Sequence, residues 1–189
     1  DFGLVLKVFH MNTSNMDRTF VVNQLSEALG AFPDRKCKIH LLHGHMSDAE
    51  MHSLYSHPQI KGLLTLTHGE GFGLPIFEAV YNGLPILAPA WSGQMDFLFA
   101  PSNSKKSNRL RPHFLKIDHD IVEIPEDVVW DGVLTRGSGW CEPQEKSAKN
   151  QMRALYKDHN RFQGQANRLK KHVLKNFTEE QKYAEFCAA

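Results

Sequence analysis

Residues 69–78 of the 189-residue chain read Gly-Glu-Gly-Phe-Gly-Leu-Pro-Ile-Phe-Glu. The apolar stretch Lys61–Thr67 precedes this segment and is typical of a buried strand. Pro75 favours the first turn of a helix, which we expect to end near Gly83. The glycines between strand and helix allow a sharp turn, and they let a ligand approach the main chain without meeting a Cβ atom. The segment therefore predicts a ligand-binding turn between a strand and a helix.

The same alternation of strand and helix extends over the first hundred residues. Apolar runs predict strands at Gly3–Phe9, Cys37–His43, Lys61–Thr67 and Pro85–Pro89. Helical spacing of apolar residues predicts a helix over 21–32, and the capping box Ser47–Glu50 predicts another that reaches about Tyr55. Such short connections imply right-handed crossovers. We therefore expect an α/β fold, a doubly wound Rossmann-like parallel sheet with helices on both faces.

In a sheet of this kind, ligands bind beyond the carboxyl ends of the strands. The loops that should hold the site are those at 10–17, 43–47, 68–75 and 90–95. The fold class indicates where a pocket lies but not which ligand fills it, because one fold serves many functions.

The regular pattern stops after residue 100. The polar and basic stretch 101–112 predicts a mobile surface loop, and 113–140 predicts an irregular insertion with an edge strand or hairpin at its start. Apolar spacing then predicts two helices before residue 176, and the capping box Thr178–Gln181 predicts a last short helix. We expect one domain over 1–176, followed by a C-terminal helix within 177–189.

The composition is that of an ordinary globular protein. Hydrophobic residues make up 41% and charged residues 23% of the chain, and 22 basic against 21 acidic side chains give a net charge of +1. This balance argues against a broad nucleic-acid-binding face. The 3 cysteines show neither a disulfide framework nor zinc spacing, which favours a reducing, cytoplasmic setting. No run reaches the roughly 18–20 apolar residues of a membrane span, and the start at Asp1 suggests a fragment or a processed chain.

The turn can be assigned chemistry residue by residue. The amides of Phe72, Gly73 and Leu74 would point outward at the positive end of a helix dipole, which suits a diphosphate. Glu78, about one turn into the helix, could accept hydrogen bonds from two neighbouring sugar hydroxyls. Glu70, still in the loop, would face a sugar beyond the phosphates.

A simpler explanation of the same segment stays open. Glycine-rich turns between strand and helix are common in α/β proteins, and an acidic residue in the first turn of a helix is favourable by itself. The pattern Gly-x-Gly-x-Gly also differs from the dinucleotide fingerprint Gly-x-Gly-x-x-Gly, so it gives little support to a nicotinamide cofactor.

Residues 69–88, GEGFGLPIFEAVYNGLPILA, resemble the motif of the group 1 family of retaining glycosyltransferases, which have the two-domain GT-B architecture. That family has Glu-x7-Glu followed by alanine and a Gly-x-Pro step at its donor site. Glu70 and Glu78 have this spacing, and Ala79, Gly83 and Pro85 match the continuation. The order of elements resembles that of the C-terminal half of the GT-B fold.

The resemblance implies specific roles for the motif. Glu70 would be the catalytic residue near the transferred sugar, and Glu78 would bind the ribose hydroxyls. The loop amides would bind the sugar or the distal phosphate, and the residues concerned are Gly71, Phe72, Gly73 and Leu74.

Other donor-site candidates follow from the same resemblance. His45 and Met46 follow the second strand, where the family brings the nucleotide base, although packing roles explain them equally well. Ser92 and Gly93 follow the fourth strand, near the donor sugar. Arg18 is the candidate to neutralise the diphosphate or, alternatively, a solvated residue at a helix start, and threonine follows it where the family usually has lysine.

The function that the resemblance implies is hexosyl transfer with retention from a UDP- or GDP-linked sugar, without a cofactor or an obligatory metal. The acceptor, an unknown carbohydrate or lipid-linked molecule, would bind an N-terminal Rossmann domain that this chain lacks. The clusters His43-Gly-His45 and Asp118-His119-Asp120 match no known metal-ligand spacing. Two alternatives remain: a non-catalytic module that senses nucleotides or scaffolds a partner, and a nucleotide-sugar epimerase on the same fold.

Overall fold

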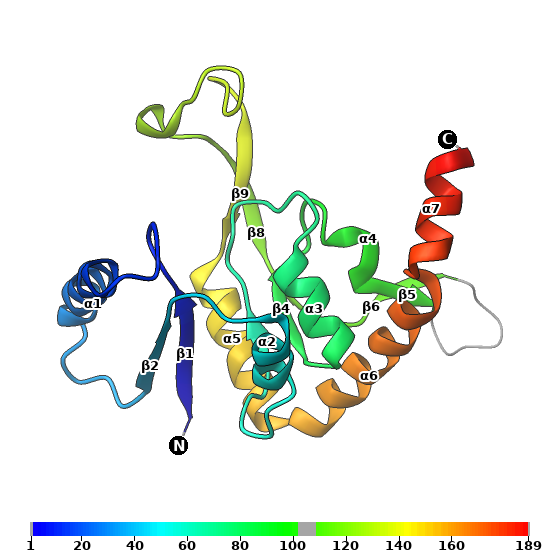
Figure 1. Cartoon of the computed structure of the whole chain (residues 1–189), viewed down its shortest axis with the longest axis horizontal. Coiled ribbons are helices and arrows are strands. Elements are labelled where there is room, and N and C mark those ends of the chain that lie inside the picture. Colours follow the sequence, from blue (N-terminus) through cyan, green and yellow to red (C-terminus); the bar gives the residue numbers. More distant parts are fainter. Residues whose placement is uncertain (1, 102–108, 189) are drawn as a thin grey trace. The chain divides into compact units, whose positions relative to one another are not determined.

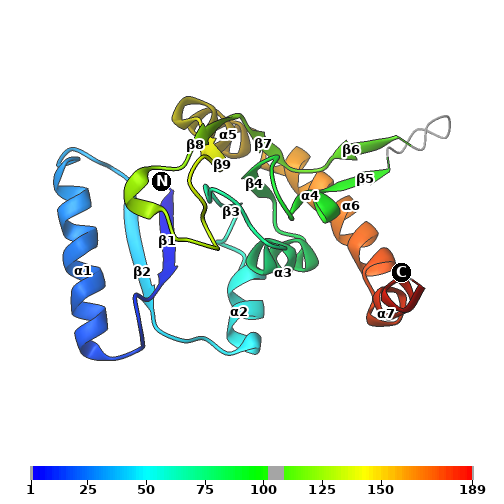
Figure 2. The same cartoon turned by 90° about the horizontal axis from the view of Figure 1, so that it is seen from above.

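The computed structural model describes residues 2–101 and 109–188, and it shows an α/β protein (Figure 1). Its contacts divide the chain into two compact units, Asp1–Met51 and His52–Ala189, here called unit 1 and unit 2. Figure 2 shows the same elements from above. Among the described helices, none combines the length and the apolar character that a membrane crossing requires.

Unit 1 is built on two parallel strands joined by a helix. The strands β1 (Gly3–Val8) and β2 (Lys38–His43) pair in register along their whole length. The helix α1 (Asn15–Gly30) begins earlier than the apolar spacing predicts, because Ser14 caps it and its Oγ accepts from the Asp17 amide at 3.2 Å. The two predicted strands are therefore confirmed, and part of the predicted loop 10–17 is helical.

The helix α2 (Asp48–Tyr55) starts in unit 1 and extends into unit 2. Its predicted capping box is confirmed, because the Ser47 amide donates to Glu50 Oε2 at 2.7 Å and the Glu50 amide donates to Ser47 Oγ at 3.4 Å. The hydrogen bonds from Ser47 lower the pKa of Glu50. The serine and the glutamate together fix the start of this helix.

Unit 2 contains a second parallel ladder, with strands in the order β3-β4-β7. The bounds are β3 (Leu63–Leu64), β4 (Ile86–Pro89) and β7 (Leu115–Ile117). The helix α3 (Leu74–Asn82) connects β3 to β4 and ends at Gly83, whose φ of 78° is left-handed. This order confirms the predicted β-α-β unit around residues 69–78.

The described strands form separate small ladders and not one clear doubly wound sheet. The strand predicted at Lys61–Thr67 pairs with β4 only through Leu63 and Leu64. One physical reason lies in β4, which Pro85 precedes and Pro89 ends. Proline has no amide hydrogen to donate, so it limits the length of the ladder.

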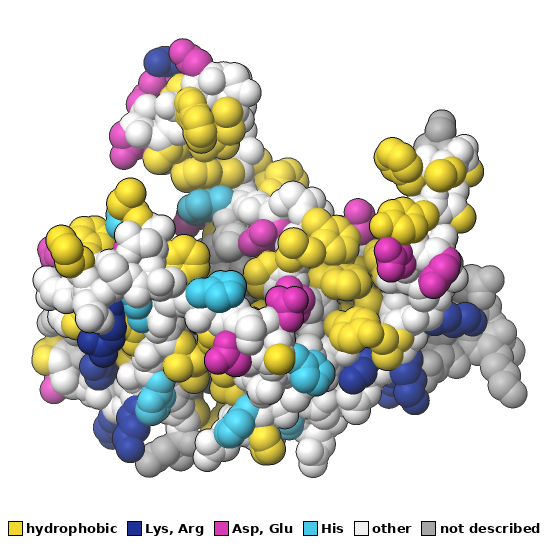
Figure 3. Space-filling model, in the orientation of Figure 1, with side chains coloured by type: hydrophobic (Ala, Val, Ile, Leu, Met, Phe, Trp, Pro, Cys, Tyr) yellow, Lys and Arg dark blue, Asp and Glu magenta, His cyan; other side chains and the backbone are white. Residues whose placement is uncertain are grey.

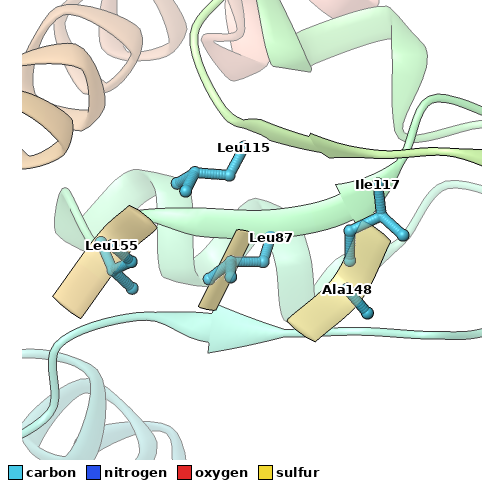
Figure 4. Packing of buried hydrophobic residues seen from close by; sticks show 5 residues of the cluster. All are labelled: Leu87, Leu115, Ile117, Ala148 and Leu155. Carbon is cyan, nitrogen blue, oxygen red and sulfur yellow. The ribbon is translucent and has the colours of Figure 1, made fainter. Parts of the chain in front are cut away.

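One hydrophobic cluster of the core of unit 2 lies between its parallel ladder and the helix α5 (Glu145–Lys157). Figure 4 shows five buried residues of this cluster: Leu87, Leu115, Ile117, Ala148 and Leu155. The first three come from β4 and β7, and the other two from α5. The helix α6 (His159–Asn176) contacts both α3 and α5. The two predicted helices before residue 176 are thus confirmed.

An aromatic cluster joins the start of α3 to the short helix α4 (Met95–Leu98) and to the end of α6. The Phe72 ring lies 5.2 Å from that of Phe77 and 5.1 Å from that of Phe97, and Phe177 contacts the last two rings. The helix α7 (Glu179–Ala188) follows, and Thr178 Oγ1 accepts from the Gln181 amide at its start. This confirms the predicted last helix.

The region after residue 98 contains more strand than the sequence pattern predicts. The strands β5 (Phe99–Pro101) and β6 (Leu110–Pro112) pair antiparallel, so the end of the predicted mobile loop at 101–112 is a strand. Residues 102–108 of that loop lie outside the described residues.

The predicted irregular insertion at 113–140 is partly regular. Its edge strand is confirmed as β7, at the edge of the three-stranded ladder. A hairpin follows, formed by β8 (His119–Glu123) and β9 (Gly139–Pro143) around a 3₁₀ helix, η1 (Glu126–Val128). Figure 1 shows this hairpin projecting in yellow-green.

Candidate functional site

The loops that follow β3 and β4 meet at the carboxyl ends of these neighbouring parallel strands. The Ser92 hydroxyl donates to the Glu70 carbonyl oxygen at 2.7 Å and accepts from the Glu70 amide at 3.2 Å. The Gly93 amide donates to the same carbonyl oxygen at 3.0 Å. The structure thus brings together three predicted site residues from two loops.

Gly93 and Gly71 make the closest approach between these loops. A Cβ atom placed on Gly93 would lie 1.9 Å from the carbonyl oxygen of Gly71. Only a residue without a side chain fits there, because the obstructing atoms belong to the main chain. Gly93 therefore has a packing role in the loop pair that the sequence analysis did not assign to it.

The start of α3 is a glycine-capped helix terminus. Gly73 caps the helix with φ 86° and ψ 52°, values that favour glycine, and Pro75 lies in the first turn. The positive end of the helix dipole lies here. Pro75 has no amide hydrogen, and the Ile76 and Phe77 amides both donate to the Gly73 carbonyl oxygen, so the candidate anion donors are the amides that precede them. The Leu74 side chain is exposed, whereas the Phe72 ring packs on Phe77 and Phe97 and anchors the loop.

Glu78 lies one turn into α3 with its side chain exposed. Burial raises the pKa of Tyr55 to about 12, and the negative charge of Glu78 adds to this rise. Glu70 is half-buried in the preceding loop. Along the chain, the two glutamates of the motif therefore flank the first turn of α3.

His68 fixes the other side of the glutamate loop and was missed by the sequence analysis. Its Nδ1 lies 2.8 Å from the carbonyl oxygen of Cys141, and the Cys141 amide donates to the His68 carbonyl at 3.1 Å. The imidazole stacks on Trp140 with centroids 3.9 Å apart and planes 5° apart. The carboxylate of Glu142 lies 3.6 Å from Nδ1. The loop that carries Glu70 is thus attached to β9 as well as to Ser92.

In unit 1, the loop after β1 folds around the buried carboxylate of Asp17. This carboxylate lies 2.7 Å from His43 Nε2. It also accepts from the main-chain amides of His10, Met11 and Asn12. The His43 hydrogen bond, followed by these amides, holds the pKa of Asp17 far below its usual range. From the sequence, His43 is a candidate only for metal binding.

The remaining predicted site residues are also in unit 1. Arg18 lies in the first turn of α1 with an exposed side chain, and its amide donates to the Ser14 carbonyl. His45 is exposed and Met46 is half-buried, both directly after β2. A basic residue that the sequence analysis missed is Lys7, whose Nζ donates to the Gly44 carbonyl.

We expect Asp17→Asn to lower the stability of the chain at neutral pH and to flatten its acid dependence. A carboxylate whose pKa is lowered by folding stabilises the folded state above its unfolded pKa, near 3.8, and loses that contribution as the pH falls further. Thermal melts monitored by circular dichroism from pH 7 to pH 2 would measure this. The control is Asp34→Asn, at an exposed aspartate of the same unit. Parallel pH curves for the wild type and Asp17→Asn would contradict the prediction.

The similarity of this chain to known proteins is structural. No family model matches the chain, and no curated protein matches it. Among solved structures, a chain in the crystal structure of a GtfA/B complex is similar over 90% of this chain, with 16% sequence identity and a TM-score of 0.41. The match covers 32% of that chain, so the present chain spans about a third of its length.

Proposed function

We propose that this chain is the donor-binding half of a glycosyltransferase of the GT-B type. It would bind a UDP- or GDP-linked sugar and, with an N-terminal domain, transfer a hexosyl group with retention to a carbohydrate or lipid-linked acceptor. The observation that carries the proposal is the placement of Glu70 and Glu78 around the glycine-capped start of α3.

Each part of this arrangement suits one part of a nucleotide sugar. The amides of Phe72, Gly73 and Leu74 would hold the diphosphate, because they lie at the positive end of the α3 dipole. Glu78 would accept hydrogen bonds from the two ribose hydroxyls, and Glu70 would lie near the transferred sugar. The match of residues 69–88 to the group 1 motif supports the same assignment.

Within unit 2, charge stabilisation of the leaving diphosphate would come from the α3 terminus. Retaining transfer requires the leaving group to be stabilised while the acceptor hydroxyl approaches. The resemblance implies no cofactor and no obligatory metal. We expect these 189 residues alone to bind the donor weakly and to transfer poorly, because in an enzyme of the GT-B type the acceptor binds the other domain.

Isothermal titration calorimetry of the 189-residue chain with UDP, GDP and their sugar conjugates tests the proposal. The expected result is measurable heat with at least one nucleotide sugar, together with a raised melting temperature. Absence of heat with every nucleotide and an unchanged melting temperature would refute it.

A non-catalytic module that senses nucleotides is the second candidate. Thr19 favours it, because this residue stands where the family usually has a lysine for the leaving diphosphate. The transferase and the non-catalytic module differ in the effect that Glu70→Ala should have on glycosyl transfer. If Glu70→Ala preserved glycosyl transfer by the chain joined to its acceptor domain, Glu70 would not be catalytic.

A further inference from the structure

The hydroxyl of Ser92 is engaged on both sides by the main chain of one residue. It donates to the Glu70 carbonyl at 2.7 Å and accepts from the Glu70 amide at 3.2 Å. A third hydrogen bond, from the Gly93 amide at 3.0 Å, also ends on the Glu70 carbonyl. Both main-chain polar groups of Glu70 are therefore satisfied by residues 92 and 93.

The backbone of Ser92 is unusual among the described residues. It has φ 68°, and it is the only residue other than glycine in the described ranges 2–101 and 109–188 with a positive φ. This conformation is unfavourable for a residue with a side chain, and it persists where the surroundings enforce it. The hydrogen bonds to Glu70 supply such a constraint, because they hold the Ser92 hydroxyl between the amide and the carbonyl of Glu70.

We propose that Ser92 is a positioning residue that fixes the main chain of Glu70, and that it does not contact the donor itself. The proposal rests on the proposed function for the role of Glu70. Because Glu70 precedes the cap of α3 by three positions, its fixed main chain sets the direction from which its carboxylate approaches a ligand at that helix terminus. Holding the loop before the ligand binds reduces the entropy lost on binding.

Two substitutions separate the hydroxyl from the backbone conformation. Ser92→Gly removes the hydroxyl and also removes the cost of the positive φ, whereas Ser92→Ala removes the hydroxyl and keeps that cost. The control is Ser56→Ala, because Ser56 is also exposed and donates a hydrogen bond, to Asn82 at the opposite end of α3.

The first measurement is amide hydrogen exchange at Glu70 by NMR in the 189-residue chain. Both Ser92 variants should exchange about tenfold faster at this amide, and the control should match the wild type. Unchanged exchange in Ser92→Gly would overturn the proposal, because the backbone conformation alone would then hold the loop.

The second measurement compares the affinities for a nucleotide sugar and for the corresponding nucleoside diphosphate. If Ser92 acts through Glu70, Ser92→Gly should weaken sugar-conjugate binding about fivefold and nucleoside-diphosphate binding less than about twofold. An equal loss for both ligands would indicate a general distortion and would overturn the positioning role. If the wild type binds neither ligand, the proposed function fails, and exchange at Glu70 alone decides whether Ser92 holds the loop.

Discussion

Gly93→Ala is expected to destabilise unit 2 by about 3 kcal/mol, the upper end of the usual cost of overpacking. The added Cβ would lie 1.9 Å from the Gly71 carbonyl oxygen and 3.0 Å from the Glu70 carbonyl oxygen. These main-chain atoms cannot rotate away as the end of a side chain could, so the two loops must separate. Separation of the loops would also break the hydrogen bond from the Gly93 amide to the Glu70 carbonyl oxygen. Thermal and urea unfolding followed by circular dichroism would measure the effect, and we expect the melting temperature to fall by roughly 10 °C.

Gly71→Ala is the matched control, because it adds the same methyl group on the opposite side of the same contact. A Cβ on Gly71 meets nothing within 4 Å, and Gly71 is not among the glycines with a positive φ. We expect a change of less than about 0.5 kcal/mol, as for most surface substitutions. Equal destabilisation by both alanines would show that this loop tolerates no side chain at all, and that the close approach at Gly93 is not the cause.

The elements with strong local patterns could be predicted from the sequence. Pro75 and Gly83 mark the two ends of α3, because one fits the first turn of a helix and the other adopts the left-handed conformation that ends it. The capping box Ser47–Glu50 fixed the start of α2 in the same way. In each case the determining interactions lie within a few residues of one another.

The elements that depend on distant partners could not be predicted as well. The strand expected at Lys61–Thr67 is short because the prolines flanking β4 restrict the ladder it can form. The hairpin partner of β8 is β9, and the region between them carries no regular alternation that would indicate it. Pairing over such a separation depends on the tertiary fold and not on local preference.

In the candidate site, too, local patterns could be predicted from the sequence, whereas contacts between distant residues could not. The motif alone indicated Glu70 and Glu78, but the hydrogen bonds from Ser92 to Glu70 span 22 positions and exist only because β3 and β4 are neighbours. The pair Asp17–His43 spans 26 positions, and in the sequence each residue looks like an ordinary solvent-exposed polar residue. Residue type could therefore suggest which side chains act, but not which of them hold the others in place.

Glu78→Ala is expected to weaken the binding of both nucleoside diphosphates and nucleotide sugars about tenfold or more. Hydrogen bonds to a charged group contribute about 1.5–3 kcal/mol, which corresponds to a factor of roughly 10 to 150 in affinity. Since both ligand types contain the ribose, the loss should be similar for the two. Glu70→Ala should differ, because it should lower the affinity only for the ligands that carry the sugar. Calorimetric titration of each variant with UDP and GDP and their sugar conjugates would separate the two roles.

The direction of the Glu78 effect is itself diagnostic. Glu78 places a negative charge one turn from a helix terminus that is proposed to hold a diphosphate, so its removal on electrostatic grounds alone would strengthen anion binding. A loss of affinity therefore requires a favourable contact that outweighs this repulsion, such as the ribose hydroxyls. The control Glu179→Ala removes the same charge from the first turn of α7 and should leave binding unchanged. Tighter nucleotide binding by Glu78→Ala would show that Glu78 does not bind the ribose, and the proposed donor site would then have lost one of its two glutamates.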